Sequence, residues 1–185
     1  MSTPSRWHIR DARKDERQVI HDLTLVAYGE FAGVMAASAW AALREALLAG
    51  LAAEHDVERI VAEQDGAPPY VGIPLVGSVM LYSPAAKAYG DALASAGVPE
   101  LRLLAVAPHA RGQGVGTALV VECAQRARRA GASALGLHTS ESLRAGIRMY
   151  ERMGFVRAPE GDFQPEGAEL VMAYRLALGD RVALS

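Results

Sequence analysis

The sequence predicts a single α/β domain of mixed α and β structure that spans residues 1–185. Its composition is that of a globular protein, because 51% of the residues are hydrophobic and the net charge is only −2. Runs of strand length and segments with helical spacing follow one another along the chain, and no repeat or low-complexity linker separates them. A chain of 185 residues fits one hydrophobic core, so we expect one domain.

The first half of the chain predicts three strands and two helices. Strands are expected where apolar and polar residues alternate, and helices where apolar residues recur every three or four positions. In order, these elements are strand 7–10, helix 12–28, helix 36–51, strand 57–64 and strand 71–82. Residues 83–99 are small, polar and interrupted by glycine and proline, which predicts a loop or a weak helix.

The second half predicts a strand–helix–strand unit. A buried strand over 100–107 leads through a glycine-rich turn into an amphipathic helix over 115–130, whose last turn holds arginines that suit the helix dipole. Gly131 is then expected to cap the C-terminus of this helix. The remaining elements are strand 134–139, helix 142–153 and a closing strand 169–178.

Composition also excludes several classes of protein. A sequence pI near 6.2 argues against a nucleic-acid binder that relies on bulk charge. The single cysteine, Cys123, excludes an intrachain disulfide and a cysteine-based zinc site. Residues 1–10 lack the apolar stretch of a signal peptide, and prolines and glycines break the uncharged segment 66–86 as a helix. We therefore expect a soluble cytoplasmic protein without a nucleic-acid or membrane partner.

Three alternating glycines carry the most specific chemical signal. Gly112, Gly114 and Gly116 lie in the turn that opens the amphipathic helix. Unpaired amides at a helix start, joined to a glycine loop that lets a phosphate approach the backbone, form an anion cradle. Arg111 adds a positive charge beside it. The pattern predicts a pyrophosphate site, and a tight turn used only for packing is the structural alternative.

Two well-known nucleotide motifs fit this segment poorly. A P-loop needs a lysine followed by serine or threonine after the last glycine, and the segment has no such lysine. The dinucleotide fingerprint needs a third glycine where Thr117 stands, and an acidic residue about 20 positions further on. The next strand instead ends at His138-Thr139, without a carboxylate. A dinucleotide-dependent oxidoreductase is thus a rival function, and titration with NAD would test it.

A third motif fits the segment. Residues 111–116, Arg-Gly-Gln-Gly-Val-Gly, resemble the Q/R-x-x-G-x-G/A signature of the GNAT superfamily of acyl-CoA-dependent N-acetyltransferases. Residues 104–108 before it and 149–155 after it are similar to the flanking patterns of that family. The order of strands and helices over residues 6–178 also matches, so the resemblance covers nearly the whole chain.

The resemblance implies a central, mostly antiparallel sheet flanked by helices, which splays between strands 100–107 and 134–139. Acetyl-CoA, the acyl donor, would lie in this splay with its pantetheine paired to the backbone like an added strand. Its pyrophosphate would lie on the loop amides with Arg111 nearby, and no metal is implied. The implied cofactor-binding residues are Leu104, Ala105, Val106, Arg111, Gly112, Gln113, Gly114, Val115, Gly116, Thr117 and Ser142.

Two residues are candidates for proton transfer, since the amine must be neutral to attack and the departing thiolate benefits from a proton donor. Tyr150 stands where the family commonly has a tyrosine that donates this proton, and a half-buried core tyrosine is the alternative. Glu100 corresponds to a glutamate that serves some members as general base. Its alternative is a solvated strand-end carboxylate, or one paired with Arg102. Strand alternation is expected to put Glu100, Arg102, Leu104 and Val106 on one face.

The sequence says less about the acceptor. His138 is expected to be a packed or solvent-facing histidine, with acceptor binding or a proton relay as the alternative. Leu143 replaces an asparagine that often bonds the cofactor in the family, and Ser140 or Ser142 would substitute for it. Candidate walls of an acceptor pocket, or simple core residues, are Tyr28, Phe31, Met35, Trp40 and the loop before Tyr70. Candidate acidic residues near the final hairpin, or a solvated loop, are Glu160, Asp162, Glu166 and Glu169.

The sequence thus predicts transfer of acetyl from acetyl-CoA to a primary amine, by direct attack in a ternary complex. The acceptor would be a small molecule or a peptide. The main rival is a catalytically silent acyl-CoA-binding or sensor domain on the same fold. Homodimers are frequent in the family, so a homodimer is compatible with this prediction, although no residue identifies an interface.

Overall fold

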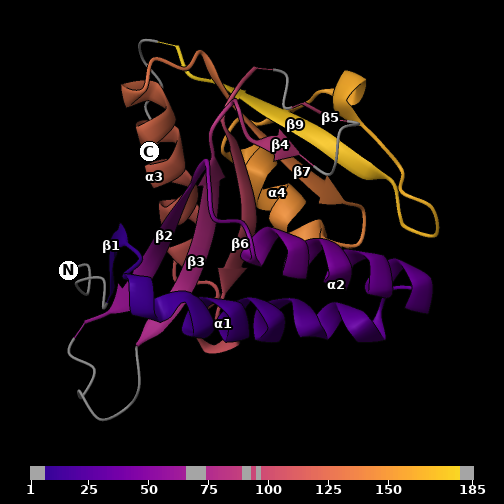
Figure 1. The fold of residues 1–185 in the computed structure, drawn as a ribbon, viewed down its shortest axis with the longest axis horizontal. Coiled ribbons are helices and arrows are strands. Elements are labelled where there is room, and N and C mark those ends of the chain that lie inside the picture. The colour runs from indigo at the N-terminus through magenta and orange to yellow at the C-terminus, as the bar shows by residue number, and fades with distance from the viewer. Residues whose placement is uncertain (1–6, 66–73, 89–92, 95–96, 180–185) are drawn as a thin grey trace.

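A computed structural model describes residues 7–65, 74–88, 93–94 and 97–179, and seven strands of this part form one sheet (Figure 1). The strand order is β1-β2-β3-β6-β7-β9-β8. Neighbouring strands run antiparallel except β6 and β7, which are parallel. This confirms the expected mixed, mostly antiparallel sheet. The bounds are β1 Trp7–Asp11, β2 Val57–Gln64, β3 Leu75–Tyr82, β6 Glu100–Val106, β7 Ala134–Ser140, β8 Val156–Arg157 and β9 Val171–Ala177.

Helices cover both faces of the sheet. Helices α1 and α2 lie side by side on one face, and α3 and α4 lie on the other (Figure 1). Their bounds are α1 Arg17–Gly29, α2 Ala37–Leu51, α3 Val115–Arg129 and α4 Arg144–Arg152. Short 3₁₀ turns are η1 Lys14–Glu16, η2 Glu30–Gly33, η3 Pro108–Ala110 and η4 Pro159–Gly161. Among the described helices, none is long and apolar enough to span a bilayer.

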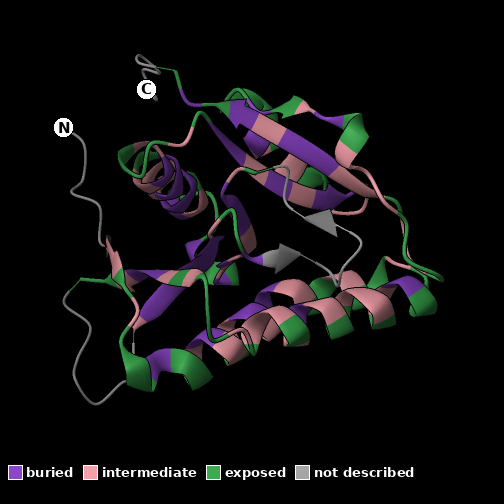
Figure 2. Ribbon diagram, turned by 45° about the horizontal axis from the view of Figure 1, so that its top comes forward, coloured by how far each residue is buried: buried purple, intermediate pink, exposed green. Residues whose placement is uncertain are grey.

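The core follows from this layering. All eight residues of β3 are buried, because helices cover both of its faces (Figure 2). Leu119, Val120 and Cys123 of α3 are fully buried against the sheet, while α1 and α2 turn exposed residues outward. The helical spacing that predicted α3 is therefore the spacing of its core face.

The structure differs from the predicted elements in four places. The helix expected from residue 12 begins at Arg17, because η1 occupies the segment before it. Within residues 83–99 the structure has two short paired strands, β4 Lys87–Ala88 and β5 Leu93–Ala94, instead of a loop or weak helix. Strand β8 is not predicted, since a two-residue strand exists only through its pairing with β9. The strand expected over 71–82 begins at Leu75, and residues 71–73 lie outside the described part.

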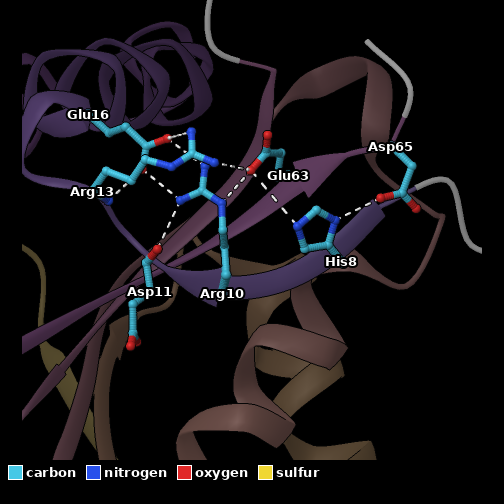
Figure 3. Close-up of polar contacts among 7 residues, drawn as sticks. All are labelled: His8, Arg10, Asp11, Arg13, Glu16, Glu63 and Asp65. Carbon is cyan, nitrogen blue, oxygen red and sulfur yellow. Dashed lines mark hydrogen bonds and ion pairs between the residues drawn. The ribbon is translucent and has the colours of Figure 1, made fainter.

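A charged network fastens β1 to β2 and η1 (Figure 3). The buried carboxylate of Glu16 accepts hydrogen bonds from Arg10 Nη1 at 2.8 Å and from the Arg13 amide at 2.6 Å. Arg10 also bonds Glu63 of β2. The hydrogen bond from Arg10 lowers the pKa of Glu16 although burial opposes this shift, so the carboxylate stays ionised. The network fixes the start of α1 relative to the sheet.

Candidate functional site

Strands β6 and β7 separate soon after they begin to pair. Their pairing is confined to Glu100–Gly136 and Leu101–Leu137 in the described chain. Directly afterwards Leu103 adopts a positive φ of 52°, and β6 gains an extra residue relative to β3. Such a bulge bends a strand. The expected splay between these two strands is confirmed.

The bulge changes which side chains of β6 share a face. Leu101 belongs to the main core, and Leu104 and Val106 also pack against it. Arg102 and Leu103 instead lie on the other side, against the cluster around Tyr82, where the Arg102 guanidinium lies 4.4 Å from the ring centroid. The expectation that Glu100, Arg102, Leu104 and Val106 share one face is therefore wrong, because the extra residue reverses the alternation.

Beyond the bulge, β6 presents an unpaired backbone edge to the splay. The Ala107 amide donates to the Val76 carbonyl of β3 at 2.9 Å. Backbone groups of alternate residues in an antiparallel pair point to opposite sides, so those of Leu104 and Val106 point away from β3. Ala105, between them, turns its backbone toward β3. This edge, formed by the backbone of Leu104 and Val106, is called the open edge below.

The glycine loop supplies unpaired donors next to the open edge. Gly112 and Gly114 have positive φ values of 72° and 83°, and Gly114 is the N-cap of α3. A Cβ atom on either would meet no atom within 4 Å. Within the described part of the chain, none of the amides of residues 112–117 donates to a backbone carbonyl. Oriented amides at a helix start suit a phosphate, so the loop fits the anion cradle that its sequence predicts.

Gly116 lies where three elements meet. A Cβ atom there would lie 3.4 Å from Met149 Sδ and 3.5 Å from Val106 Cγ2, which are ordinary van der Waals distances. The first turn of α3 thus meets both the end of β6 and helix α4.

Arg111 has its guanidinium turned toward α1. Its Nη1 donates to Glu30 Oε2 at 2.6 Å, its Nη2 to the Ala27 carbonyl at 3.0 Å, and its Nε to the Val106 carbonyl at 3.4 Å. Tyr28, also in α1, donates its hydroxyl to the Leu104 carbonyl at 3.1 Å. Burial raises the pKa of Tyr28 to about 12, which keeps this donor protonated. The sequence analysis missed both tertiary contacts, since 76 residues separate Tyr28 from Leu104 and no local pattern links them.

Tyr150 is buried at the end of α4, and its ring packs edge-on against Phe155 at 5.6 Å. Its hydroxyl has no hydrogen-bond partner among the described residues. Burial strongly raises the pKa of this phenol, so it is protonated at neutral pH. The residue is thus a core side chain whose hydroxyl keeps its proton at neutral pH.

Glu100 and His138 form a buried pair across the point where β6 and β7 separate. His138 Nδ1 bonds Glu100 Oε1, Arg102 Nη2 donates to Glu100 Oε2 at 2.6 Å, and His138 Nε2 bonds the Gly161 carbonyl at 3.0 Å. Burial alone would raise the pKa of Glu100, but the bonds and charges of His138 and Arg102 lower it. Burial alone would lower the pKa of His138, but Glu100 raises it. His138 is packed, as expected, and its ring lies 5.5 Å from Phe163.

The turn between β7 and α4 carries a second carboxylate contact. Ser142 donates its hydroxyl to Glu169 Oε1 at 2.5 Å and its amide to Oε2 at 3.3 Å. Leu143, where the family often has asparagine, is the N-cap residue of α4 and forms no side-chain cap. Ser140 is buried, and its hydroxyl has no partner in the described residues.

The remaining acceptor candidates lie in several elements. Tyr28 and Phe31 lie 6.1 Å apart between ring centroids, and Met35 and Trp40 are half-buried. Tyr70 lies outside the described residues. Of the other acidic candidates, Asp162 pairs with Arg157 at 2.6 Å, whereas Glu160 and Glu166 are exposed.

Comparison with known proteins adds sequence and fold relationships. A family model described as the acetyltransferase (GNAT) family matches residues 17–155. A search of curated proteins found no significant match.

Solved structures resemble nearly the whole chain. The ribosomal-protein-S18-alanine N-acetyltransferase from Escherichia coli has a TM-score of 0.61 at 15% identity, covering 96% of this chain and 97% of that one. YncA from Salmonella typhimurium, described as an acetyltransferase and solved with acetyl-CoA, has a TM-score of 0.58 at 19% identity, covering 97% and 98%. A spermidine N-acetyltransferase chimera from Vibrio cholerae and hSSAT has a TM-score of 0.59 at 19% identity, covering 94% and 96%. At these identities the likeness establishes a common fold.

Proposed function

Since this chain belongs to the GNAT acetyltransferase family, we propose that it transfers acetyl from acetyl-CoA to a primary amine by direct attack in a ternary complex. The observation that carries the proposal is the set of unpaired amides at the start of α3, beside the open edge of β6. A phosphate group needs such donors, and an extended chain with amide groups needs such an edge. Acetyl-CoA contains both groups.

The residues divide this binding between them. The amides of Gly112, Gln113, Gly114, Val115, Gly116 and Thr117 would hold the pyrophosphate. The backbone of Leu104 and Val106 would pair with pantetheine, and Ser142 would contact it only by exchanging its bond to Glu169. Acetyl-CoA supplies the acetyl group as a thioester. The protein's task is to orient it and to move protons.

Tyr150 is the proposed proton donor to the departing sulfur. The burial that keeps it protonated also makes it a weaker acid. We therefore expect it first to donate a hydrogen bond as negative charge develops on the sulfur, with proton transfer following. Preformed donors aimed at developing charge contribute much of the catalysis in many enzymes.

Glu100 is the proposed general base, and its surroundings limit how it can act. Its lowered pKa supplies the carboxylate form that a base requires, but both oxygens are already bonded, to His138 and to Arg102. Proton uptake therefore has to accompany a loosening of one of these bonds. These bonds also favour the second candidate function, a domain that binds acyl-CoA without turnover.

The named structural neighbours indicate only the chemical class of the acceptor. One neighbour is named for an alanine of a ribosomal protein and another for spermidine, and both are amines. A primary amine on a small molecule or peptide is therefore the proposed acceptor. Use of acetyl-CoA and a single buried cysteine fit a cytoplasmic protein.

A thiol-release assay tests the function. Purified protein is mixed with acetyl-CoA and a panel of amines, and free CoA thiol is measured independently of which amine accepts. Release that depends on an amine supports acetyl transfer. Calorimetric binding of acetyl-CoA without release for any amine supports the silent binding domain, and absence of binding contradicts both.

A further inference from the structure

The last turn of α1 lies against the open edge of β6. Tyr28 donates to the Leu104 carbonyl at 3.1 Å from this turn, and the Ala27 carbonyl of the same turn accepts from Arg111 at 3.0 Å. Both carbonyls of the open edge are thus reached by side chains, because Arg111 also donates to the Val106 carbonyl at 3.4 Å. In the described chain no strand pairs with this part of β6 on the side that faces the splay, although β3 pairs with it on the other side.

The guanidinium of Arg111 already has an anionic partner. Glu30, the first residue after α1, accepts from it at 2.6 Å, and a cation suits the negative C-terminal end of the helix. The glycine loop therefore offers a phosphate its neutral amides, while the arginine beside it is held by another element. This differs from the sequence expectation that Arg111 places its charge beside the phosphate.

We infer that Tyr28, Glu30 and Arg111 are positioning residues of the acetyl-CoA site, which hold the open edge and the glycine loop in register from the end of α1. This inference rests on the proposed function. Leu103, directly before the edge, has a positive φ, and β6 lacks a partner on the splay side beyond it. An unsupported strand end would have to become ordered when a ligand pairs with it, and that ordering lowers affinity.

The positioning role and a direct phosphate contact predict opposite effects for Glu30. If Arg111 contacts phosphate, Glu30 competes with the ligand, and Glu30→Ala should tighten acetyl-CoA binding. If Arg111 positions the edge, Glu30→Ala should weaken binding, because the guanidinium loses its anchor. The sign of the change therefore decides between the two roles.

The experiment is a double-mutant cycle read by calorimetric acetyl-CoA binding. Glu30→Ala and Arg111→Ala are each expected to weaken binding about threefold to tenfold. The double variant should bind no more weakly than the single variant with the lower affinity. Tyr28→Phe should weaken binding similarly while kcat at saturating acetyl-CoA stays near wild type. Arg17→Ala and Glu54→Ala remove a more exposed surface pair, 3.1 Å apart at the first residue of α1, and should leave affinity unchanged.

A second variant guards against loss of fold. Arg111→Lys keeps the charge but cannot make three separate contacts. It should bind acetyl-CoA as weakly as Arg111→Ala if the residue positions the edge, and nearly as well as wild type if its charge contacts phosphate. Tighter binding by Glu30→Ala, additive losses, or full affinity in Arg111→Lys would each overturn the inference. Wild-type protein that does not bind acetyl-CoA would overturn the proposed function and this inference with it.

Discussion

Glu100 and His138 stabilise the fold only while both are charged. The folded pKa of Glu100 lies below its ordinary 4.5, so its contribution is complete above 4.5 and disappears as pH falls through the lowered value. The folded pKa of His138 lies above its ordinary 6.5, so its contribution is complete below 6.5 and disappears as pH rises through the raised value. The pair therefore stabilises most between about pH 4.5 and 6.5.

His138→Gln should lower the free energy of unfolding by roughly 3 kcal/mol in that window, since it leaves a buried carboxylate with one partner fewer. The difference from wild type should shrink at lower and at higher pH. Urea unfolding across a pH series measures it, with His21→Gln, at an exposed surface pair, as the control. A difference that does not depend on pH would contradict the ion-pair assignment.

Turnover of Glu100→Gln separates a base from a structural carboxylate. As the base, Glu100 matters most where the acceptor amine is protonated, so the variant should lose most turnover near neutral pH and less in alkali. Affinity for acetyl-CoA should change little. A pH–rate profile with the shape of the wild-type profile would leave Glu100 with a structural role.

Tyr150→Phe removes the hydroxyl and keeps the ring that packs on Phe155. If the hydroxyl serves the departing sulfur, kcat should fall roughly 10²–10³-fold with little change in KM. Tyr174→Phe is the matched control. Tyr174 lies on β9, and its hydroxyl donates to Glu151 of α4 at 3.4 Å. Full turnover by a folded Tyr150→Phe protein would refute the assignment.

At this scale the sequence predicts residue types better than partners. The glycine motif is a local pattern, Tyr150 follows from the family resemblance, and the Glu100–Arg102 pair is an alternative for Glu100 that the short spacing of two positions suggests. The bond between Glu100 and His138 joins two strands 38 residues apart, and Arg111 to Glu30 spans 81 residues. Such pairings depend on the folded topology, which no local spacing encodes.

Among the elements, the start of α3 and its end offer a matched pair of glycines. Gly114 and Gly131 have φ values of 83° and 82°, and a Cβ atom on either meets open space. A non-glycine residue at either position costs about 1–2 kcal/mol of backbone strain.

Gly114→Glu should weaken acetyl-CoA binding by roughly 3 kcal/mol, because a carboxylate in the cradle repels phosphate and blocks charge-assisted hydrogen bonds. Gly131→Glu should lose similar stability and keep its affinity. Calorimetry with melting curves for both variants provides the measurement. Equal affinities of the two variants for acetyl-CoA would show that the glycine loop does not bind the pyrophosphate.

Element prediction worked where a pattern was long and failed where tertiary pairing decided. Strand β2 matches its predicted bounds, because its alternation and the turn after it are local signals. The bulge at Leu103 was missed, since nothing in an apolar strand marks which residue will be extra. That miss produced the wrong assignment of faces in β6.

For the molecule as a whole, a ligand that binds only the folded protein stabilises it by mass action. Acetyl-CoA at about 100 times its Kd should add roughly 2.7 kcal/mol, which for a domain of this size raises Tm by roughly 5–10 °C. NAD at the same concentration should leave Tm unchanged. A larger rise in Tm with NAD than with acetyl-CoA would favour the rival function, a dinucleotide-dependent oxidoreductase.

The two-residue pairing of β6 with β7 divides the sheet into β1-β2-β3-β6 and β7-β9-β8. Within the described chain, few backbone hydrogen bonds cross that boundary, so sub-global opening can separate the blocks at less cost than unfolding either one. Native-state hydrogen exchange should then show two protection levels, one on each side of the boundary. A ligand lying between the blocks would couple them, and the amides of β9 would gain protection although β9 does not adjoin the splay.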